Sequence, residues 1–259
     1  MSIHGMTKEI HPEAIVHTWN IFAPWRHCMT AALVAQESPS GPLNLAHRPP
    51  RPREELLRHR QRVHQALDLP QLPWATLSQI HGTTIIPAHE ATEIPQKGDG
   101  ILLTKPRSLG AVLLADCHPV VIYDPILHQA CVCHAGWRGT VAGMAGAAVD
   151  ELKKRGSLAK NLIAGVGGGI GPCCYPVGEE VVQALRQLPG HPEQLYSQQE
   201  GVWYANLEEA NAAVLQESGV PSSQIGRAGI CTACQPGEFH SYRRDGQNAG
   251  RHAALFFLK

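Results

Sequence analysis

Apolar runs bounded by Gly, Pro and short polar clusters alternate through the middle of the chain, a pattern typical of buried strands. One run, Gly110–Ala115, is followed by Asp116-Cys117, and a second, Gln129–Cys133, is followed by His134. These runs predict two central strands joined through a turn at Asp124-Pro125. Each strand brings a thiol or an imidazole to its end, so we expect the chemistry of the protein in this region.

Further strands are predicted on both sides of this region. They cover residues 13–22, Trp74–Ile80, Thr83–Ile86, Gly98–Thr104, Asn161–Val166 and the closing strand His252–Leu258. His81 lies between two of these strands and precedes Gly82. A glycine at this point favours a sharp turn. We therefore expect the imidazole of His81 to be exposed.

Helices are predicted where apolar side chains recur every three to four residues. These segments are Glu54–Leu67, residues 140–155, a segment from Gly178 toward Pro189, and Asn206–Gly219. The second has Thr140 as its expected N-cap and follows His134 closely. Residues 134–139 are therefore expected to connect a strand to a helix, and ligands bind at such strand ends in open α/β sheets.

A glycine-rich run follows the strand at Asn161–Val166. Its glycines do not fall in the GxGxxG register, and no Gly-Lys-Ser/Thr follows, so neither dinucleotide fingerprint nor P-loop is present. Close approach of the backbone to a ligand or to a neighbouring strand is the better interpretation.

The amino-acid composition limits the classes of function that the protein can have. Hydrophobic residues make up 43% of the chain and charged residues 17%, and Lys plus Arg equal Asp plus Glu at 22 each. This balance gives no general attraction to nucleic acid or to anionic lipid. The first ten residues lack the apolar run of a secretory signal, and no apolar segment approaches the roughly 20 residues that span a bilayer. We expect a cytoplasmic globular protein.

The eight cysteines do not match a known local zinc motif. Only Cys231-Thr-Ala-Cys234 has CxxC spacing, and no second CxxC supplies the remaining ligands. A redox role is open to this CxxC, but no helix pattern follows it, and a structural role is expected. The other cysteines are expected mainly as small buried hydrophobic residues.

Two imidazoles and a thiolate, from His81, Cys117 and His134, form a suitable zinc set with a fourth position for water or substrate. The alternative is three unrelated core residues, which their separations of 36 and 17 positions favour when taken alone. Asp116 is expected either as a hydrogen-bond acceptor or general base beside the metal, or as a turn residue bonded to its own backbone.

Several arginines are candidates for anion binding, because a guanidinium matches phosphate in bidentate fashion. Each is alternatively a surface or structural ion-pair residue. The polar segment near the C-terminus supports a substrate-binding loop. The candidates are Arg138, Ser241, Arg243, Arg244 and Arg251.

Six motifs occur in the order found in one known family. They are Gln79-Ile-His-Gly82, Gly98-Asp-Gly-Ile-Leu-Leu-Thr104, Ala115-Asp-Cys-His-Pro119, His134-Ala-Gly-Trp-Arg-Gly139, Gly171-Pro172 with Tyr175-Pro-Val-Gly178, and Ser241-Tyr-Arg-Arg-Asp245 with Gly250-Arg251. Together they resemble the purine nucleoside phosphorylase family once called laccase-domain or multicopper polyphenol oxidase proteins, which includes the bacterial peptidoglycan-editing factor.

This resemblance implies a single αββα sandwich domain over residues 1–259, an α/β (α+β) fold with mixed β-sheets. It implies that His81, Cys117 and His134 bind a catalytic zinc ion. It also implies phosphorolysis of adenosine, inosine and methylthioadenosine, with deamination of adenosine as a second activity. The partners would be a purine nucleoside and phosphate, without nucleic acid or membrane, and a monomer is the working expectation. Either Asp116 or Asp99 would protonate the leaving amine.

The chain departs from the family pattern at two places. Residues 32–44 keep only a trace of an expected Ser-x-Arg and Gly-Gly-Val-Ser-like segment, at Gly41–Asn44. Asn206 replaces an Asp before the last predicted helix, a mild change if the residue is an N-cap.

Four other functions are alternatives to this one. A hydrolase that edits a peptidoglycan precursor would use the same metal site in a long open groove. A metal-free cysteine hydrolase would use Cys117 as nucleophile and His134 as base. Copper-dependent phenol oxidation is disfavoured, because a multicopper site needs more clustered His-x-His ligands. A zinc-stabilised interaction module is the non-enzymatic alternative.

Overall fold

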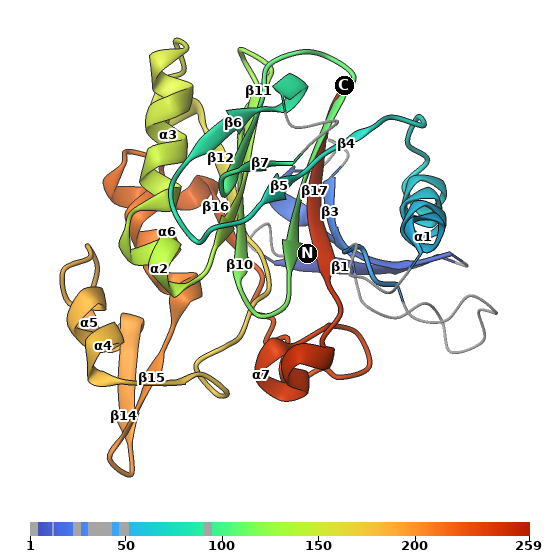
Figure 1. The fold of residues 1–259 in the computed structure, drawn as a ribbon. Helices are drawn as coiled ribbons and strands as arrows, with labels where there is room; N and C mark the ends of the chain where they lie inside the picture. The colour runs from blue at the N-terminus through green and yellow to red at the C-terminus, as the bar shows by residue number, and fades with distance from the viewer. Residues whose placement is uncertain (1–4, 12, 23–26, 31–42, 47–51, 91–94) are drawn as a thin grey trace.

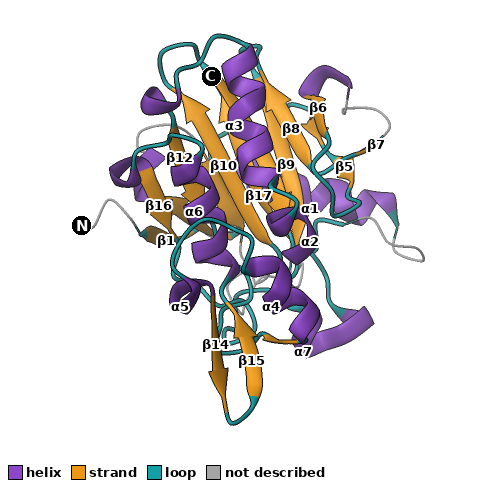
Figure 2. Ribbon diagram, turned by 90° about the vertical axis from the view of Figure 1, so that its left-hand side faces the viewer, coloured by secondary structure: helices purple, strands orange, loops and turns teal. Residues whose placement is uncertain are grey.

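The computed structural model describes residues 5–11, 13–22, 27–30, 43–46, 52–90 and 95–259. Within these residues two mixed β-sheets pack face to face, and helices cover the outer face of each sheet (Figure 1, Figure 2). The four layers form the αββα sandwich implied by the family resemblance, so the predicted fold class is confirmed.

The first sheet joins the two ends of the described chain. Its neighbouring strands are antiparallel except for β4 and β9, which are parallel. The closing strand β17 coincides with the predicted range, and β2 lies inside the predicted 13–22. The strand order is β1 (Met6–Ile10), β2 (Ile15–Trp19), β3 (His27–Thr30), β17 (His252–Leu258), β9 (Ser108–Leu114) and β4 (Trp74–Ala75).

The second sheet contains the central strands. Its outer pairs, β16 with β12 and β8 with β6, are parallel, whereas the inner pairs are antiparallel. The strand order is β16 (Ile225–Arg227), β12 (Ile163–Val166), β10 (His118–Asp124), β11 (Gln129–Ala135), β8 (Gly100–Leu103) and β6 (Ile85–Pro87).

Smaller strands complete the β structure. Strand β5 (Leu77–Ser78) pairs with β7 (Gln96–Lys97). A separate antiparallel unit, which the sequence pattern did not predict, contains β13 (Pro176–Val177), β15 (Val202–Ala205) and β14 (Tyr196–Gln199).

The sequence pattern predicts two central strands, but the structure has three, so this prediction is wrong. Between residues 108 and 135 the chain forms β9, β10 and β11, and only β10 and β11 are joined through the turn after Asp124. Strand β10 begins at His118-Pro119, a start that obscures a strand in the sequence, although all seven of its residues are buried. Because β9 and β10 belong to different sheets, residues 115–117 cross from one sheet to the other.

The outer helix layers bury apolar faces against the sheets. Helix α1 (Arg53–Ala66) covers the first sheet, and α3 (Met144–Lys154) and α6 (Leu207–Glu217) cover the second (Figure 2). Shorter helices surround the lower end of the second sheet: α2 (Trp137–Val141), α4 (Glu179–Leu185), α5 (Pro192–Leu195) and α7 (Tyr242–Asp245).

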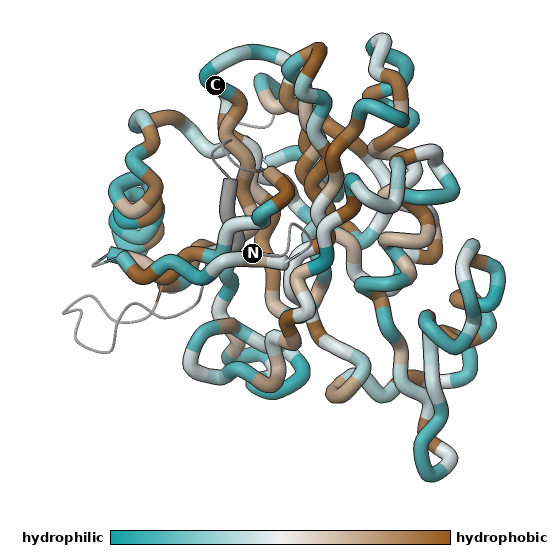
Figure 3. The backbone as a smooth tube through the Cα atoms, turned by 180° about the vertical axis from the view of Figure 1, so that it is seen from behind, coloured by the Kyte–Doolittle hydropathy of each residue, from teal (hydrophilic) through white to brown (hydrophobic). Residues whose placement is uncertain are grey.

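Strand β17 shows why the layers form. Its Leu255 and Phe257 belong to the cluster under α1, whereas Phe256 and Leu258 belong to the cluster between the sheets. This alternation follows the two-residue period of a strand that is buried on both faces. Burial of each such side chain stabilises the fold by roughly 1.5–3 kcal/mol. Figure 3 shows the hydrophobic colouring concentrated in the central strands.

The predicted helix over residues 140–155 is interrupted. Helix α2 already begins at Trp137, Thr140 lies inside it, and α3 begins after Gly143, whose φ of 82° is left-handed. Thr140 is therefore not an N-cap; its hydroxyl oxygen instead accepts a hydrogen bond from Asn211 Nδ2 at 3.0 Å. The glycine permits the break, because it adopts positive φ without steric cost.

The glycine-rich run after β12 packs closely against neighbouring strands, as predicted. A Cβ atom at Gly167 would lie 2.5 Å from Pro119 Cγ and 2.6 Å from Trp19 Cζ2, and one at Gly169 would lie 2.6 Å from His118 Cδ2. The glycines thus serve backbone packing. In the part of the chain that the structure describes, no helix is both long and apolar enough to cross a membrane.

Candidate metal centre and substrate cavity

The crossing between the two sheets positions Cys117. Residues 115–117 leave β9 in the first sheet and enter β10 in the second, and Asp116 takes a left-handed φ of 87° at the crossing. His134 lies on the neighbouring strand β11, where Pro119 is its partner in register. The fold therefore brings Cys117 and His134 to the same end of the neighbouring strands β10 and β11.

His81 joins these two residues from a turn between β5 and β6. Its φ of 61° is left-handed and its side chain is exposed, as the neighbouring glycine predicted. One ligand atom from each of His81, Cys117 and His134 lies within 4.8 Å of the others. The rings of His81 and His134 are 4.9 Å apart and nearly perpendicular. The three residues are thus a cluster and not unrelated core residues.

The buried carboxylate of Asp99 fixes two members of this cluster. It accepts hydrogen bonds from the backbone N–H groups of Ile80, His81 and Gly82, at 3.2, 2.9 and 2.7 Å. His134 Nδ1 lies 2.9 Å from the same carboxylate. Asp99 is fully buried and does not line the cavity, so this geometry supports a positioning role and not that of an acid. The sequence alone suggests for Asp99 only the role of an acid.

The cluster favours an ionised thiol. Burial raises the pKa of Cys117, but the positive charge of His134 and hydrogen bonds to both imidazoles outweigh this effect and lower it to about 6. Burial lowers the pKa of His134, yet the Cys117 charge and the bond to Asp99 raise it to about 9. Both shifts favour a thiolate paired with an imidazolium.

The donor set fits a zinc ion. Cys and His are zinc ligands, and a carboxylate on the second nitrogen of a ligating histidine is the usual way to fix its orientation. The bond of His134 Nδ1 to Asp99 leaves Nε2 for a metal. Gly136 makes the close approach possible, since a Cβ there would lie 2.8 Å from Cys117 Sγ and 3.1 Å from His81 Cδ2.

A cavity of about 610 Å³ opens next to the cluster. This volume is within the range of small-molecule sites, about 300–1,000 Å³. Polar groups and aromatic or aliphatic side chains share its lining, which suits a ligand that is partly flat and partly charged. Besides the three cluster residues, the walls include Leu77, Gln79, Asp116, Trp137, Arg138, Ile170, Tyr175, Leu207, Tyr242, Arg243 and Arg251.

Asp116 links three loops of the cavity wall. Its carboxylate accepts from Thr232 Oγ1 at 2.7 Å, from Ser241 Oγ at 3.0 Å and from the backbone N–H of Arg243 at 2.6 Å. Its own carbonyl accepts from the N–H of Ile170 at 2.7 Å. The acceptor role is thus the one that the geometry favours, because none of these bonds stays within the turn.

The candidate arginines divide into two groups. Arg138, Arg243 and Arg251 line the cavity. Arg138 stacks on Trp137 and Arg243 on Tyr175, with the guanidinium carbons 4.4 and 5.1 Å from the ring centres. Within the described residues neither of these two pairs with a carboxylate, so both retain positive charge for an anion.

Ser241 and Arg244 are not part of the cavity wall. Ser241 is fully buried and its hydroxyl also caps α7 by accepting from the N–H of Arg244. The Arg244 guanidinium donates to the carbonyl of Phe239 at 2.8 Å and pairs with Asp245 at 2.7 Å. Ser241 and Arg244 thus stabilise the loop through hydrogen bonds and do not line the cavity.

The structure describes the two departures from the family pattern to different extents. Most of segment 32–44 lies outside the described residues, but Asn44 is buried and its side-chain oxygen accepts from the N–H of Arg251 at 3.0 Å. Asn206 is the N-cap of α6 and accepts from the N–H of Glu209 at 3.3 Å, so the condition for a mild change is met.

Comparison with known proteins gives the class to which this fold and site belong. The chain belongs to the family described as multi-copper polyphenol oxidoreductase laccase, whose model matches residues 27–259. The resemblance seen in the motifs is therefore confirmed.

Relatives in this family carry the names of purine enzymes. The purine nucleoside phosphorylase YlmD of Geobacillus stearothermophilus is 33% identical over 216 residues, 78% of each chain. The adenosine deaminase RL5, from an unknown prokaryotic organism, is 37% identical over 139 residues, 53% of each chain. The crystal structure of YlmD from Geobacillus stearothermophilus matches with a TM-score of 0.87 and 28% identity, over 98% of each chain.

The role of Asp99 is tested by Asp99→Asn. The amide replaces one carboxylate oxygen by a donor, which weakens the bonds to the His81 turn and to His134 Nδ1. We expect zinc affinity to fall about 10- to 100-fold, the usual effect of removing a partner of a ligating histidine. Competition with a chromophoric chelator measures this affinity. Asp124→Asn is the matched control, since Asp124 is equally buried but bonds the turn at Ile126. Equal zinc affinity in the two variants would contradict the role of Asp99.

Proposed function

We propose that the protein is a zinc-dependent purine nucleoside phosphorylase, acting on adenosine, inosine and methylthioadenosine, with adenosine deaminase activity. The observation that carries the proposal is the meeting of His81, Cys117 and His134 at a small-molecule cavity that Arg138 and Arg243 also line. The names of the relatives, a purine nucleoside phosphorylase and an adenosine deaminase, support phosphorolysis of purine nucleosides and deamination of adenosine.

The residues of the site fit zinc better than copper. A copper site with two histidines and one cysteine often adds a weak axial methionine. No methionine of the described residues lines the cavity. His81, Cys117 and His134 would bind the zinc ion. When bound, zinc supplies a Lewis acid that polarises a substrate group and makes a water molecule a better nucleophile.

In phosphorolysis an oxygen of phosphate attacks C1′ of the ribose, the bond from C1′ to the purine nitrogen breaks, and the base leaves with the bonding electrons and takes up a proton. Arg138 and Arg243 carry the charges that would bind and orient the phosphate. Preorganised charge of this kind lowers the barrier because it needs no rearrangement during the reaction.

Flat side chains in the wall suit the purine. Trp137 and Tyr175 line the cavity, and each is covered on one side by an arginine. Burial, assisted by the Cys117 charge, raises the pKa of Tyr175 to about 12. The phenol therefore keeps its proton at neutral pH and can donate a hydrogen bond to the substrate.

In deamination a water oxygen adds to C6 of adenosine and the amino group leaves as ammonia, which needs a proton. Asp116 is the carboxylate in the wall, and its three acceptor bonds favour a positioning role. To transfer a proton, it would have to release one of them.

The metal-free cysteine hydrolase is the second candidate, because the lowered pKa of Cys117 and the nearby His134 also suit a nucleophile and base. Editing of a peptidoglycan precursor is the alternative biological role. The small-molecule size of the cavity favours a nucleoside over the long groove that editing would use.

Turnover with and without metal separates these candidates. Chromatography of adenosine reactions should show adenine only with phosphate, and inosine without it. Removal of zinc by a chelator should abolish both products, and added zinc should restore them. Cys117→Ala should lower both rates by at least about 100-fold, because it removes one of the three zinc ligands, and losing only a partner of such a ligand already costs about 10- to 100-fold.

His89→Ala is the control, since His89 is exposed and does not line the cavity. Activity that survives chelation but is lost to iodoacetamide would favour the cysteine hydrolase instead. Unchanged turnover by Cys117→Ala would contradict the proposed function.

Arg243→Ala tests the phosphate site. Loss of one charge-assisted bond, about 1.5–3 kcal/mol, should raise the KM for phosphate roughly 10- to 100-fold, and deamination should change little. The steady-state rate against phosphate concentration measures this effect. Arg155→Ala, at an exposed ion pair next to the end of α3, is the control. An equal loss of both activities would show that Arg243 does not act on phosphate.

A further inference from the structure

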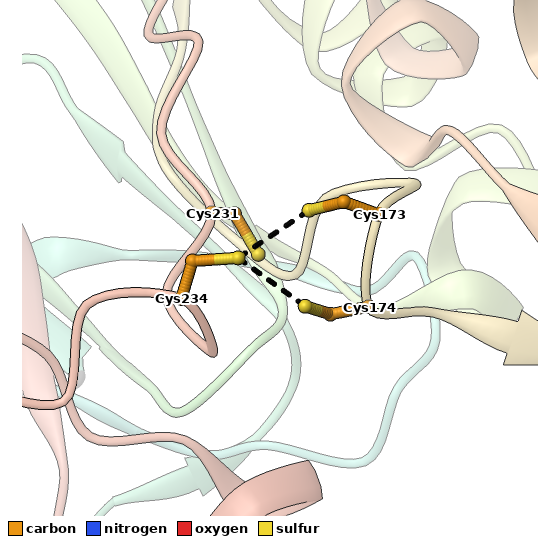
Figure 4. Close-up of side chains that lie close together, drawn as sticks. All are labelled: Cys173, Cys174, Cys231 and Cys234. Atoms are coloured by element: carbon orange, nitrogen blue, oxygen red, sulfur yellow. Dashed lines mark hydrogen bonds between the residues drawn. The ribbon is translucent and has the colours of Figure 1, made fainter.

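Four cysteine side chains from two loops meet beside the cavity (Figure 4). Cys173 and Cys174 follow the glycine-rich run after β12, and Cys231 and Cys234 follow β16. The outer two, Cys173 and Cys234, are exposed, and the other two are half-buried. The expectation of small buried hydrophobic cysteines is therefore wrong for Cys173 and Cys174. A zinc site needs two more ligands than Cys231 and Cys234 provide. The adjacent Cys173 and Cys174 supply them in place of a second CxxC motif.

The spacing of the sulfur atoms matches a tetrahedral ion. All four Sγ atoms lie within 4.8 Å of one another. Cys234 Sγ is 3.5 Å from that of Cys173 and 3.3 Å from that of Cys174. Zinc–sulfur bonds of about 2.3 Å in a tetrahedron place the sulfur atoms about 3.8 Å apart. Small side-chain movements would bring each sulfur to a central ion.

The backbone already aligns the two loops. Gly169 and Cys231 form a parallel β-bridge, and the N–H of Thr232 donates to the carbonyl of Gly169 at 2.8 Å. The N–H of Gly171 points to Cys231 Sγ at 3.2 Å. A backbone N–H directed at sulfur stabilises a thiolate, as the outer partners of metal ligands do. The site is thus largely formed before an ion binds.

We propose that Cys173, Cys174, Cys231 and Cys234 form a second, structural zinc site, separate from the cluster at His81. A closed set of four thiolates leaves no open position, which is the arrangement of structural zinc. Binding releases the thiol protons to solvent, and the charge of the cation offsets the mutual repulsion of the thiolates that form.

The position of this site suggests what the ion does. Tyr175 in the cavity wall directly follows Cys174, and Thr232, whose hydroxyl donates to Asp116, directly follows Cys231. A zinc ion would therefore join two loops of the wall, and the residues on both loops would keep their places.

The test uses a protein that keeps all four cysteines. In His81→Ala/Cys117→Ala/His134→Ala, we expect about one zinc ion per chain to remain, against about two in the wild type. Elemental analysis after gel filtration measures this ratio. Cobalt in place of the remaining zinc should give the intense sulfur-to-metal absorption of a tetrathiolate site. Adding Cys231→Ser/Cys234→Ser should remove this ion and its spectrum, whereas Cys131→Ala should not.

Several results would overturn the proposal. These are a triple variant that binds no zinc, bound iron instead of zinc, or disulfides among the four cysteines seen by mass spectrometry of the native protein. Zinc absorption spectroscopy of the wild type covers the case in which variants do not fold. A zinc coordination shell with more than one sulfur ligand per zinc on average supports the site, whereas an average of about one sulfur ligand per zinc contradicts it. Failure of the cluster at His81 alone would leave the cysteine signal intact, so the two sites are tested independently.

Discussion

The arrangement of the site depends on the buried carboxylate of Asp99. A buried charge of this kind is stable only when its oxygens are fully hydrogen-bonded. The three N–H groups of the His81 turn and the His134 ring supply these bonds. The pKa of Asp99 is lowered because the bonds from His134 and the backbone outweigh the effect of burial. One charge thus fixes both imidazoles, and it raises the proton affinity of His134, which in turn favours the Cys117 thiolate.

A second carboxylate, in the wall of the cavity, also fixes several segments. Asp116 lies at the crossing between the sheets and bonds the segments at Thr232, Ser241 and Arg243. The proposed zinc site at the four cysteines joins the same wall from its outer side. The cavity is therefore bounded by loops that are linked to the two-sheet core at more than one point, which suits a site whose charges must be fixed before substrate binds. Arg138 and Arg243 line this cavity, and their guanidinium groups lie over aromatic rings of the wall, where they can meet an anion.

The sequence predicted the αββα fold class through its motifs, and the closing strand and the cap at Asn206 through local pattern alone. The cluster of His81, Cys117 and His134 was predicted from the ends of strands and from the family. The pattern missed β10, because His118-Pro119 does not resemble the start of a buried strand. It also joined α2 to α3, since the left-handed Gly143 cannot be distinguished from a tolerated helical glycine. The roles of Asp99, Ser241 and Arg244 and the meeting of the four cysteines arise from contacts between distant segments, which local spacing does not encode.

The most direct test of the account is a crystal structure of the protein grown with zinc, with anomalous diffraction recorded on both sides of the zinc absorption edge. The account predicts an anomalous peak bounded by His81, Cys117 and His134, at about 2.0–2.3 Å from the donor atoms. It also predicts that the Asp99 carboxylate still bonds His134 Nδ1 and the His81 turn. A fully occupied zinc elsewhere with none at these residues, or a His134 ring turned away from Asp99 in the zinc-bound site, would contradict it.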